Sequence, residues 1–187
     1  MKIFGSDDWS WLNPPASWAE TGAGLSVTTS PKTDFWRTTH YGFIRDTGHA
    51  LGRRLTGEFT LTTTFSGAYA DLYDHAGVLL RIDERNWIKT GIEYVGGEQL
   101  LSSVVTRDVS DWSVVSLPSP PGSVTLSVDR TGDTVTVHYG VDGAKPVTMA
   151  RLAYFPAEPE VFAGVMCASP EGGGFKVDFT RLDLAQR

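Results

Sequence analysis

Polar and apolar residues alternate along most of this chain, a pattern typical of β-strands that bury one face. The clearest run spans residues 57–69, where Phe59, Leu61, Thr63 and Phe65 alternate with polar side chains. Helical periodicity is missing almost everywhere, and turns rich in Gly, Pro, Asn and Asp separate the runs. The pattern predicts an all-β protein with about eleven to thirteen strands.

The stretch from Asp71 to Glu93 predicts a hairpin with its turn at residues 84–86. Pairing Asp83 with Trp87 gives one apolar face, made by Ala76, Val78, Leu80, Ile82, Ile88 and Ile92. The opposite face then carries a polar set, Arg81, Asp83, Trp87, Lys89 and Glu93, with Arg81 directly across from Lys89. We therefore expect a core face backed by a charged face, and the charged face is the candidate binding surface.

A further strand over residues 100–108 follows the loop 96–99 and is expected to extend the charged face. If this loop closes tightly, Glu93 lies opposite Ser102. No repeat or linker divides the chain, and strands of the same character flank residues 118–122, the best candidate boundary. The sequence predicts one domain, residues 1–187, folded as a two-sheet antiparallel sandwich of the jelly-roll type.

Composition narrows the choice of partner. The net charge of -6 and pI near 5.1 argue against nucleic acid or an anionic membrane, and favour a sugar, another polar small molecule or a protein. The single cysteine, Cys167, excludes an internal disulfide and fits a reducing compartment. No apolar run resembles a signal peptide or a membrane span, so we expect a cytoplasmic protein.

Three motifs carry a family resemblance, and they are DHAGVLLRIDERNWIKTGIEY, LSSVVTRDVSDWS and FAGVMCASPEGGGFKVDF. With them the chain resembles the small concanavalin A-like proteins grouped as domain-of-unknown-function family 1349. The resemblance spans nearly the whole chain. It implies a lectin/glucanase-type sandwich with a curved sheet that forms a groove. It implies no activity, because the family has no established catalytic role to carry over.

Aromatic rings that stack on sugars, together with polar groups that orient hydroxyls, are the expected signature of a saccharide site. The candidates for ligand binding are Trp36, Arg37, His40, Tyr73, His75, Arg81, Trp87, Lys89 and Glu93. The competing interpretation of these charges is a solvated sheet face. For the aromatic residues it is ordinary packing.

Catalysis is an alternative to binding. A hydrolase or lyase would use Glu93 with His75 or Tyr73 as an acid/base pair. The Glu-x-Asp-x-Glu strand motif of concanavalin-like glucanases does not occur, which counts against glucanase chemistry. The four histidines are scattered and no phosphate loop precedes a helix, so we expect neither metal nor cofactor.

The first hypothesis is therefore a non-catalytic, lectin-like protein that binds a saccharide or a similar polar small molecule. The second is a carbohydrate-active enzyme. The third, which only the family resemblance suggests, is a regulatory protein-interaction module in central metabolism.

Overall fold

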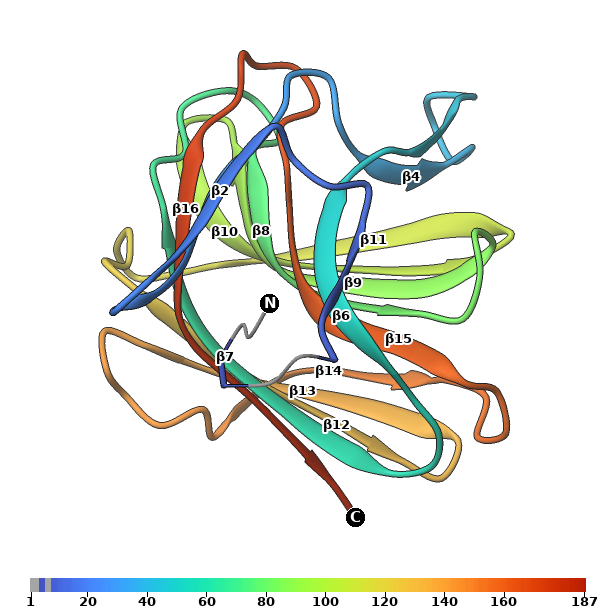
Figure 1. Ribbon diagram of the computed structural model, residues 1–187. Coiled ribbons are helices and arrows are strands. Elements are labelled where there is room, and N and C mark those ends of the chain that lie inside the picture. Colours follow the sequence, from blue (N-terminus) through green and yellow to red (C-terminus); the bar gives the residue numbers. More distant parts are fainter. Residues whose placement is uncertain (1–3, 6–7) are drawn as a thin grey trace.

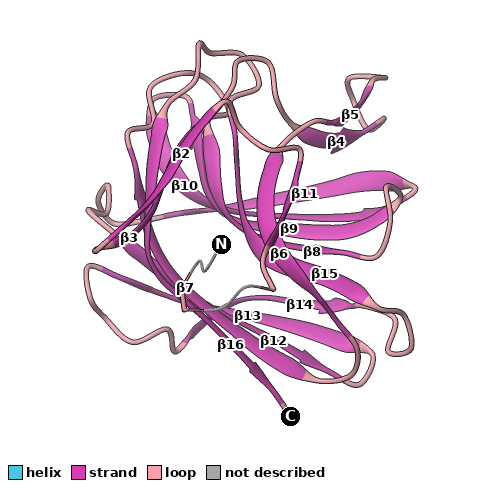
Figure 2. Cartoon of the chain, in the orientation of Figure 1, coloured by secondary structure: helices cyan, strands magenta, loops and turns pink. Residues whose placement is uncertain are grey.

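The computed structural model describes residues 4–5 and 8–187, and within them it contains strands and loops and no helix (Figures 1 and 2). The prediction of an all-β protein is confirmed. The described residues form sixteen strands, more than the sequence predicted, because three-residue strands are too short to show alternation.

Two seven-stranded sheets pack face to face, and neighbouring strands in each are antiparallel. The first, called the site sheet below, has the order β1 (Ser10–Leu12), β6 (His49–Leu55), β15 (Val161–Ala168), β8 (His75–Arg81), β9 (Asn86–Val95), β10 (Glu98–Arg107) and β11 (Val109–Ser116). The second, the back sheet, has the order β14 (Thr148–Tyr154), β13 (Thr134–Val141), β12 (Val124–Thr131), β7 (Phe59–Gly67), β16 (Lys176–Gln186), β3 (Gly24–Thr28) and β2 (Ser17–Thr21).

The main core lies between the two sheets. From the back sheet, Phe59, Leu61 and Phe65 of β7 point inward and are at most 1% exposed. From the site sheet, Val78 and Leu80 of β8 meet them with no exposed surface. The alternation along residues 57–69 is therefore confirmed as a half-buried strand.

The predicted hairpin exists, but its predicted register is wrong by two residues. Arg81, and not Asp83, lies opposite Trp87, so Leu79 takes the place across from Lys89. The turn is longer than expected because Ile82 and Asp83 stay outside the ladder. The Asp83 carboxylate accepts hydrogen bonds from the Arg85 amide at 2.8 Å and the Asn86 side chain at 2.9 Å. A shift of two residues preserves which side chains share a face.

The next pairing is displaced in the same way. Glu93 lies opposite Leu100 in β10, where the sequence predicted Ser102.

Gly77 of β8 and Gly91 of β9 face each other, and a Cβ on either would lie 2.0 Å from a carbonyl oxygen of the neighbouring strand. The close approach of the two backbones at this level requires glycine on both strands.

The predicted charged face is not a solvated surface. A small hairpin, β4 (Phe35–Arg37) and β5 (Ile44–Asp46), lies over the outer face of the site sheet beside β11 (Figure 1). Beneath it a second apolar cluster forms, made by Phe35, Trp36, Ala50, Leu79, Trp87, Val104, Phe162 and Met166. Sequence alternation separated the two faces of the hairpin correctly, but it carried no information on the segment that covers one of them.

Candidate functional site

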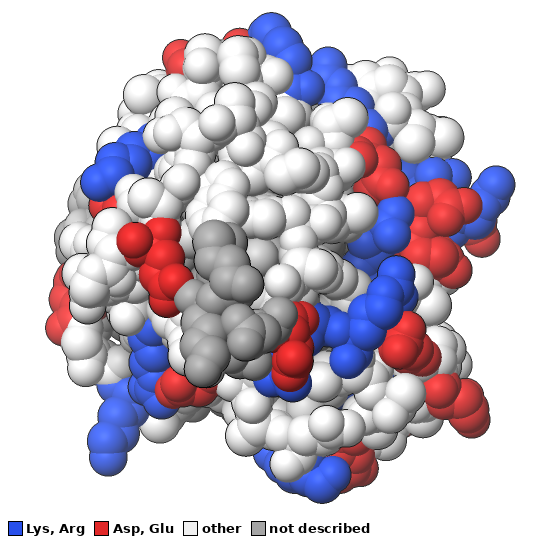
Figure 3. Space-filling view, in the orientation of Figure 1, with Lys and Arg blue, Asp and Glu red and all other residues white. Residues whose placement is uncertain are grey.

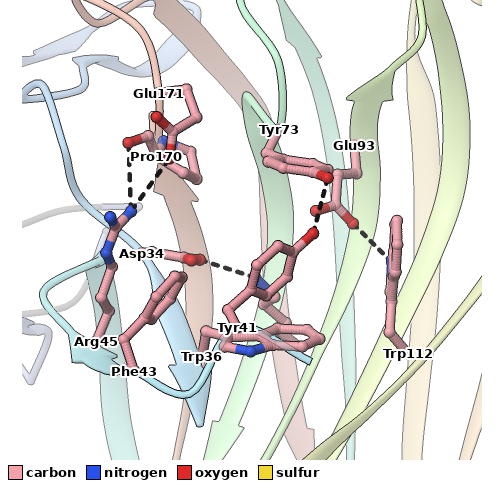
Figure 4. Close-up of a pocket in the computed structure, with 11 residues that line it drawn as sticks. Asp34, Trp36, Tyr41, Phe43, Arg45, Tyr73, Glu93, Trp112, Pro170 and Glu171 are labelled. Atoms are coloured by element: carbon pink, nitrogen blue, oxygen red, sulfur yellow. Dashed lines mark hydrogen bonds and ion pairs between the residues drawn. The ribbon is translucent and has the colours of Figure 1, made fainter. Parts of the chain in front are cut away.

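A small pocket of about 60 Å³, partly open to solvent, lies where the small hairpin meets the outer face of the site sheet (Figure 4). Residues from five separate parts of the chain line it, and these are Asp34, Trp36, Tyr41, Phe43, Arg45, Tyr73, Lys89, Glu93, Trp112, Pro170 and Glu171. The site sheet contributes its floor, and the small hairpin with its loop contributes one wall.

Five aromatic side chains surround the opening. Tyr41 stacks on Phe43 with ring centroids 5.4 Å apart and meets Trp36 edge-on at 5.7 Å. Tyr73 receives the edge of Tyr41 on one side and of Trp112 on the other. The hydroxyls of Tyr41 and Tyr73 share a hydrogen bond of 2.8 Å, which closes one side of the pocket.

The loop that carries Tyr41 is conformationally strained. Thr38 and His40 have φ angles of 64° and 63°, which non-glycine residues seldom adopt. The amides of Thr39 and Tyr41 each bond the carbonyl two residues back at 2.7 Å, so two γ-turns follow one another. The Trp36 indole donates to the Thr39 carbonyl at 2.9 Å and fixes the loop to the strand. Such strain concentrates at functional segments.

Glu93 is 6% exposed, and two hydrogen bonds fix the orientation of its carboxyl group. One of its oxygens accepts hydrogen bonds from the Ser102 hydroxyl at 2.6 Å and the Trp112 indole at 2.9 Å. The other has no hydrogen-bond partner among the described residues and lies on the side of Tyr73 in Figure 4. Glu93 therefore presents one acceptor oxygen, in a fixed orientation, toward the pocket.

A buried ion pair lies at the bottom of the pocket. The Lys89 ammonium donates to the Asp34 carboxylate at 3.1 Å and to Nε2 of His75 at 3.3 Å. Burial raises the pKa of Asp34, but attraction to Lys89 and the hydrogen bond from its ammonium outweigh burial, so the pKa lies below its usual range. Asp34 is therefore ionised at neutral pH and balances the charge of Lys89.

His75 is neutral and fully engaged. Burial and the neighbouring Lys89 lower its pKa. Its Nδ1 lies 2.7 Å from the Tyr73 carbonyl, which can only accept, so Nδ1 carries the proton and Nε2 accepts from Lys89. No ring nitrogen is left to bond Glu93, so the predicted acid/base pair of His75 with Glu93 is not formed in this arrangement.

The structure brings four of the nine predicted binding residues together in the pocket, and these are Trp36, Tyr73, Lys89 and Glu93. His75 lies beneath them, 2% exposed, in a small cavity that Lys89 and Glu93 also line. His40 lines a separate, open hollow of about 700 Å³, which Trp36, Tyr41 and Trp112 also line.

The remaining three predicted residues do not line the pocket. The Arg37 side chain donates to the Asp108 carbonyl at 3.1 Å. Arg81 pairs with Asp46 of the small hairpin at 2.6 Å. Trp87 is 1% exposed and packs against the ring of Phe35. These three residues attach the small hairpin to the site sheet.

Several pocket residues escaped the candidate set, namely Asp34, Tyr41, Phe43, Arg45, Trp112, Pro170 and Glu171. The dense aromatic and charged composition of residues 34–45 was a usable signal for the first four. Pro170 and Glu171 follow β15 and reach the pocket only through the tertiary fold, so no local pattern marks them.

Two further observations concern ions and membranes. Across residues 4–5 and 8–187, no cluster of three or more His, Cys, Asp or Glu side chains has the geometry to hold a metal ion. None of the described segments forms a helix with the length and apolar character needed to cross a membrane.

Known proteins match this chain in both sequence and fold. A family model described as "Protein of unknown function (DUF1349)" matches residues 11–187. Regulation of enolase protein 1 of Saccharomyces cerevisiae is 39% identical over 175 residues, which cover 94% of this chain and 88% of that protein. A crystal structure of a functionally unknown protein from Saccharomyces cerevisiae superposes with a TM-score of 0.90 at 37% identity, covering 96% of this chain and 97% of that one.

A more distant structure shows the fold alone. The carbohydrate binding module CBM66 of Bacillus subtilis superposes with a TM-score of 0.62 at 11% identity, and the match covers 96% of each chain. The predicted concanavalin A-like jelly-roll sandwich is confirmed, and so is the resemblance noted from the three motifs. The boundary of a single domain at residues 1–187 stays a prediction.

Proposed function

This chain belongs to the DUF1349 family of proteins of unknown function, and we propose that its pocket binds a saccharide or a similar polar small molecule without catalysing a reaction. The observation that carries the proposal is the ring of five aromatic side chains around a fixed carboxylate oxygen. Aromatic faces stack on the apolar faces of sugar rings, and carboxylates accept hydrogen bonds from sugar hydroxyls.

The pocket is small, about 60 Å³, and partly open to solvent, so it suits a ligand that inserts one ring or one terminal group. The overall likeness to a carbohydrate binding module, which covers 96% of both chains, supports the same ligand class.

The charges favour a ligand without a strong net charge. Asp34 balances Lys89 within the pocket, and Arg45 at the rim lies 3.5 Å from Glu171. Of the acidic side chains that line the pocket, this leaves Glu93, which bonds Ser102 and Trp112 rather than a cation. On the face shown in Figure 3, acidic and basic residues are interspersed rather than gathered by sign. Selection would therefore rest on stacking and hydroxyl recognition.

A matched pair of tyrosine variants tests the proposal. Ligands found on a glycan array are titrated by calorimetry into the wild type, Tyr41→Ala and Tyr154→Ala. Tyr41 is 41% exposed and lines the pocket, whereas Tyr154 is 51% exposed on β14, outside it. Loss of the Tyr41 ring should weaken binding about tenfold, which is about 1.4 kcal/mol, and Tyr154→Ala should leave it unchanged. Equal effects of the two variants, or an array without a single ligand, would refute saccharide binding at this pocket.

A regulatory protein-interaction role and a cytoplasmic location remain predictions from the sequence. The name of the yeast relative supports the first.

A further inference from the structure

Lys89 has surroundings unlike those of the other lysines that the structure describes. Lys32 and Lys176 have side chains that are 62% and 60% exposed, and Lys145 also lies at the surface. Lys89 is 4% exposed, yet it lines the pocket together with Asp34 and Glu93. A buried ammonium group needs anionic or hydrogen-bond-accepting neighbours in place of water. The identity of these neighbours determines the chemistry that the amine can perform.

The partners of Lys89 include a proton acceptor. Nε2 of neutral His75 lies 3.3 Å from the Lys89 nitrogen with its lone pair directed at it. The Asp34 carboxylate lies 3.1 Å from the Lys89 nitrogen and 3.9 Å from Nε2 of His75, so it faces both groups. If the proton moves from Lys89 to His75, the three groups keep the same total charge and Asp34 still faces a cation. The cluster can therefore release a neutral amine without creating an unbalanced buried charge.

From this geometry we propose that Lys89 is a nucleophile that captures the carbonyl group of a small polyhydroxy aldehyde or ketone as an imine. His75 takes one proton from the ammonium, and the free amine forms a bond to the carbonyl carbon. The carbonyl oxygen leaves as water, with one hydrogen from the nitrogen and one from His75. The product is an iminium cation that keeps its ion pair with Asp34, and nothing is oxidised or reduced.

The rest of the pocket defines the class of carbonyl compound. The unpartnered oxygen of Glu93 can accept a hydrogen bond from a hydroxyl next to the carbonyl, and Tyr41 and Tyr73 provide two further hydroxyls. Tyr41 stands at the exposed tip of the small hairpin, and Lys89 lines the same partly open pocket. This inference concerns covalent capture and does not depend on reversible saccharide binding.

Reductive trapping tests the inference on the intact wild-type chain. The protein is incubated at pH 7 with limiting glycolaldehyde and sodium cyanoborohydride, which converts an imine into a stable secondary amine. Peptide mapping by mass spectrometry then compares Lys89 with Lys32, Lys145 and Lys176. We expect Lys89 to be labelled at least tenfold faster than each exposed lysine. Labelling of the exposed lysines while Lys89 stays unmodified would overturn the proposal.

A His75→Asn variant tests the role of the histidine. The asparagine amide keeps a donor for the Tyr73 carbonyl but offers no basic nitrogen to Lys89. We expect labelling of Lys89 to fall at least tenfold at pH 7 and to return only as the pH rises toward the ordinary lysine pKa of about 10.4. Labelling of Lys89 at pH 7 with an unchanged rate would contradict the proton transfer. Should this variant fail to fold, the wild-type labelling pattern still decides whether Lys89 is the nucleophile.

Discussion

The two faces of the site sheet are buried to nearly the same degree, but they are built from different chemistry. On the inner face, Val78, Leu80 and Ile88 are at most 1% exposed and pack against apolar side chains of the back sheet. On the outer face, Lys89 and Glu93 are 4% and 6% exposed beneath the small hairpin. Burial alone therefore does not identify the core of this protein, because the outer buried face contributes the floor of the pocket.

The difference lies in how each face is stabilised. The inner face gains free energy from the removal of apolar surface from water, which requires no particular orientation. On the outer face each charge requires a named partner, as Lys89 has in Asp34 and Glu93 has in Ser102 and Trp112. The outer face is therefore stable in only one arrangement of its side chains, and a selective site requires such a fixed arrangement.

The largest expected effect comes from breaking the buried ion pair with Lys89→Met. The variant leaves the Asp34 carboxylate buried without its cation, and we expect the free energy of unfolding to fall by roughly 3–5 kcal/mol. Urea denaturation followed by circular dichroism measures the change. The matched control is the double variant Lys89→Met with Asp34→Asn, which removes the stranded charge and should recover most of the loss. A loss below about 1 kcal/mol for the single variant, as for an exposed ion pair, would mean that the outer face is solvated.

Two adjacent leucines compare the faces directly. Leu80 points into the core between the sheets and Leu79 into the cluster under the small hairpin, and neither is exposed. Leu80→Ala should cost roughly 3–5 kcal/mol and Leu79→Ala nearer 2 kcal/mol, because a short hairpin can settle onto the cavity more readily than a seven-stranded sheet. The same denaturation experiment measures both. Equal losses would remove the distinction between a rigid inner face and a compliant outer one.

The smallest effect concerns the tyrosine pair at the mouth of the pocket. The hydrogen bond to Tyr73, aided by burial, raises the pKa of Tyr41 to about 12. A tyrosine whose pKa is higher in the folded than in the unfolded protein stabilises the fold. The contribution is complete at pH values below the ordinary tyrosine pKa of about 10, and it is lost as the pH rises through 12. Tyr73→Phe should move the Tyr41 transition back toward the ordinary value, as followed by tyrosinate absorbance.

Tyr154→Phe is the control for that titration, because Tyr154 stands on the back sheet and away from the pocket. It should leave the Tyr41 transition near pH 12 in place. Survival of that transition in Tyr73→Phe would show that the hydrogen bond is not its cause.

Much of the fold followed from the sequence because strand alternation is a local property. The inward residues of β7 and the two faces of the β8–β9 hairpin were predicted correctly. The register was wrong by two residues because Asp83 closes a longer turn through its own side chain, a contact that alternation does not encode.

The site followed only in part, because it depends on contacts between distant segments. Lys89 and Glu93 were predicted from one strand and Trp36 from an aromatic stretch, and all three reach the pocket. The ionic partner of Lys89, Asp34, comes from a segment 55 residues away, and no spacing rule could connect the two. The covering hairpin likewise has strands too short for a periodic signal, so the wall that it adds over the sheet was not predicted.

The positions of the tryptophans have an optical consequence. Trp36 and Trp112 form part of the pocket wall, so a molecule that enters changes the polarity around both indoles. Trp87 lies behind them, 1% exposed against Phe35, where solvent does not reach it. Emission from Trp36 and Trp112 should therefore change when a molecule occupies the pocket, whereas emission from Trp87 should not. Intrinsic fluorescence can follow occupancy of the pocket without an added dye.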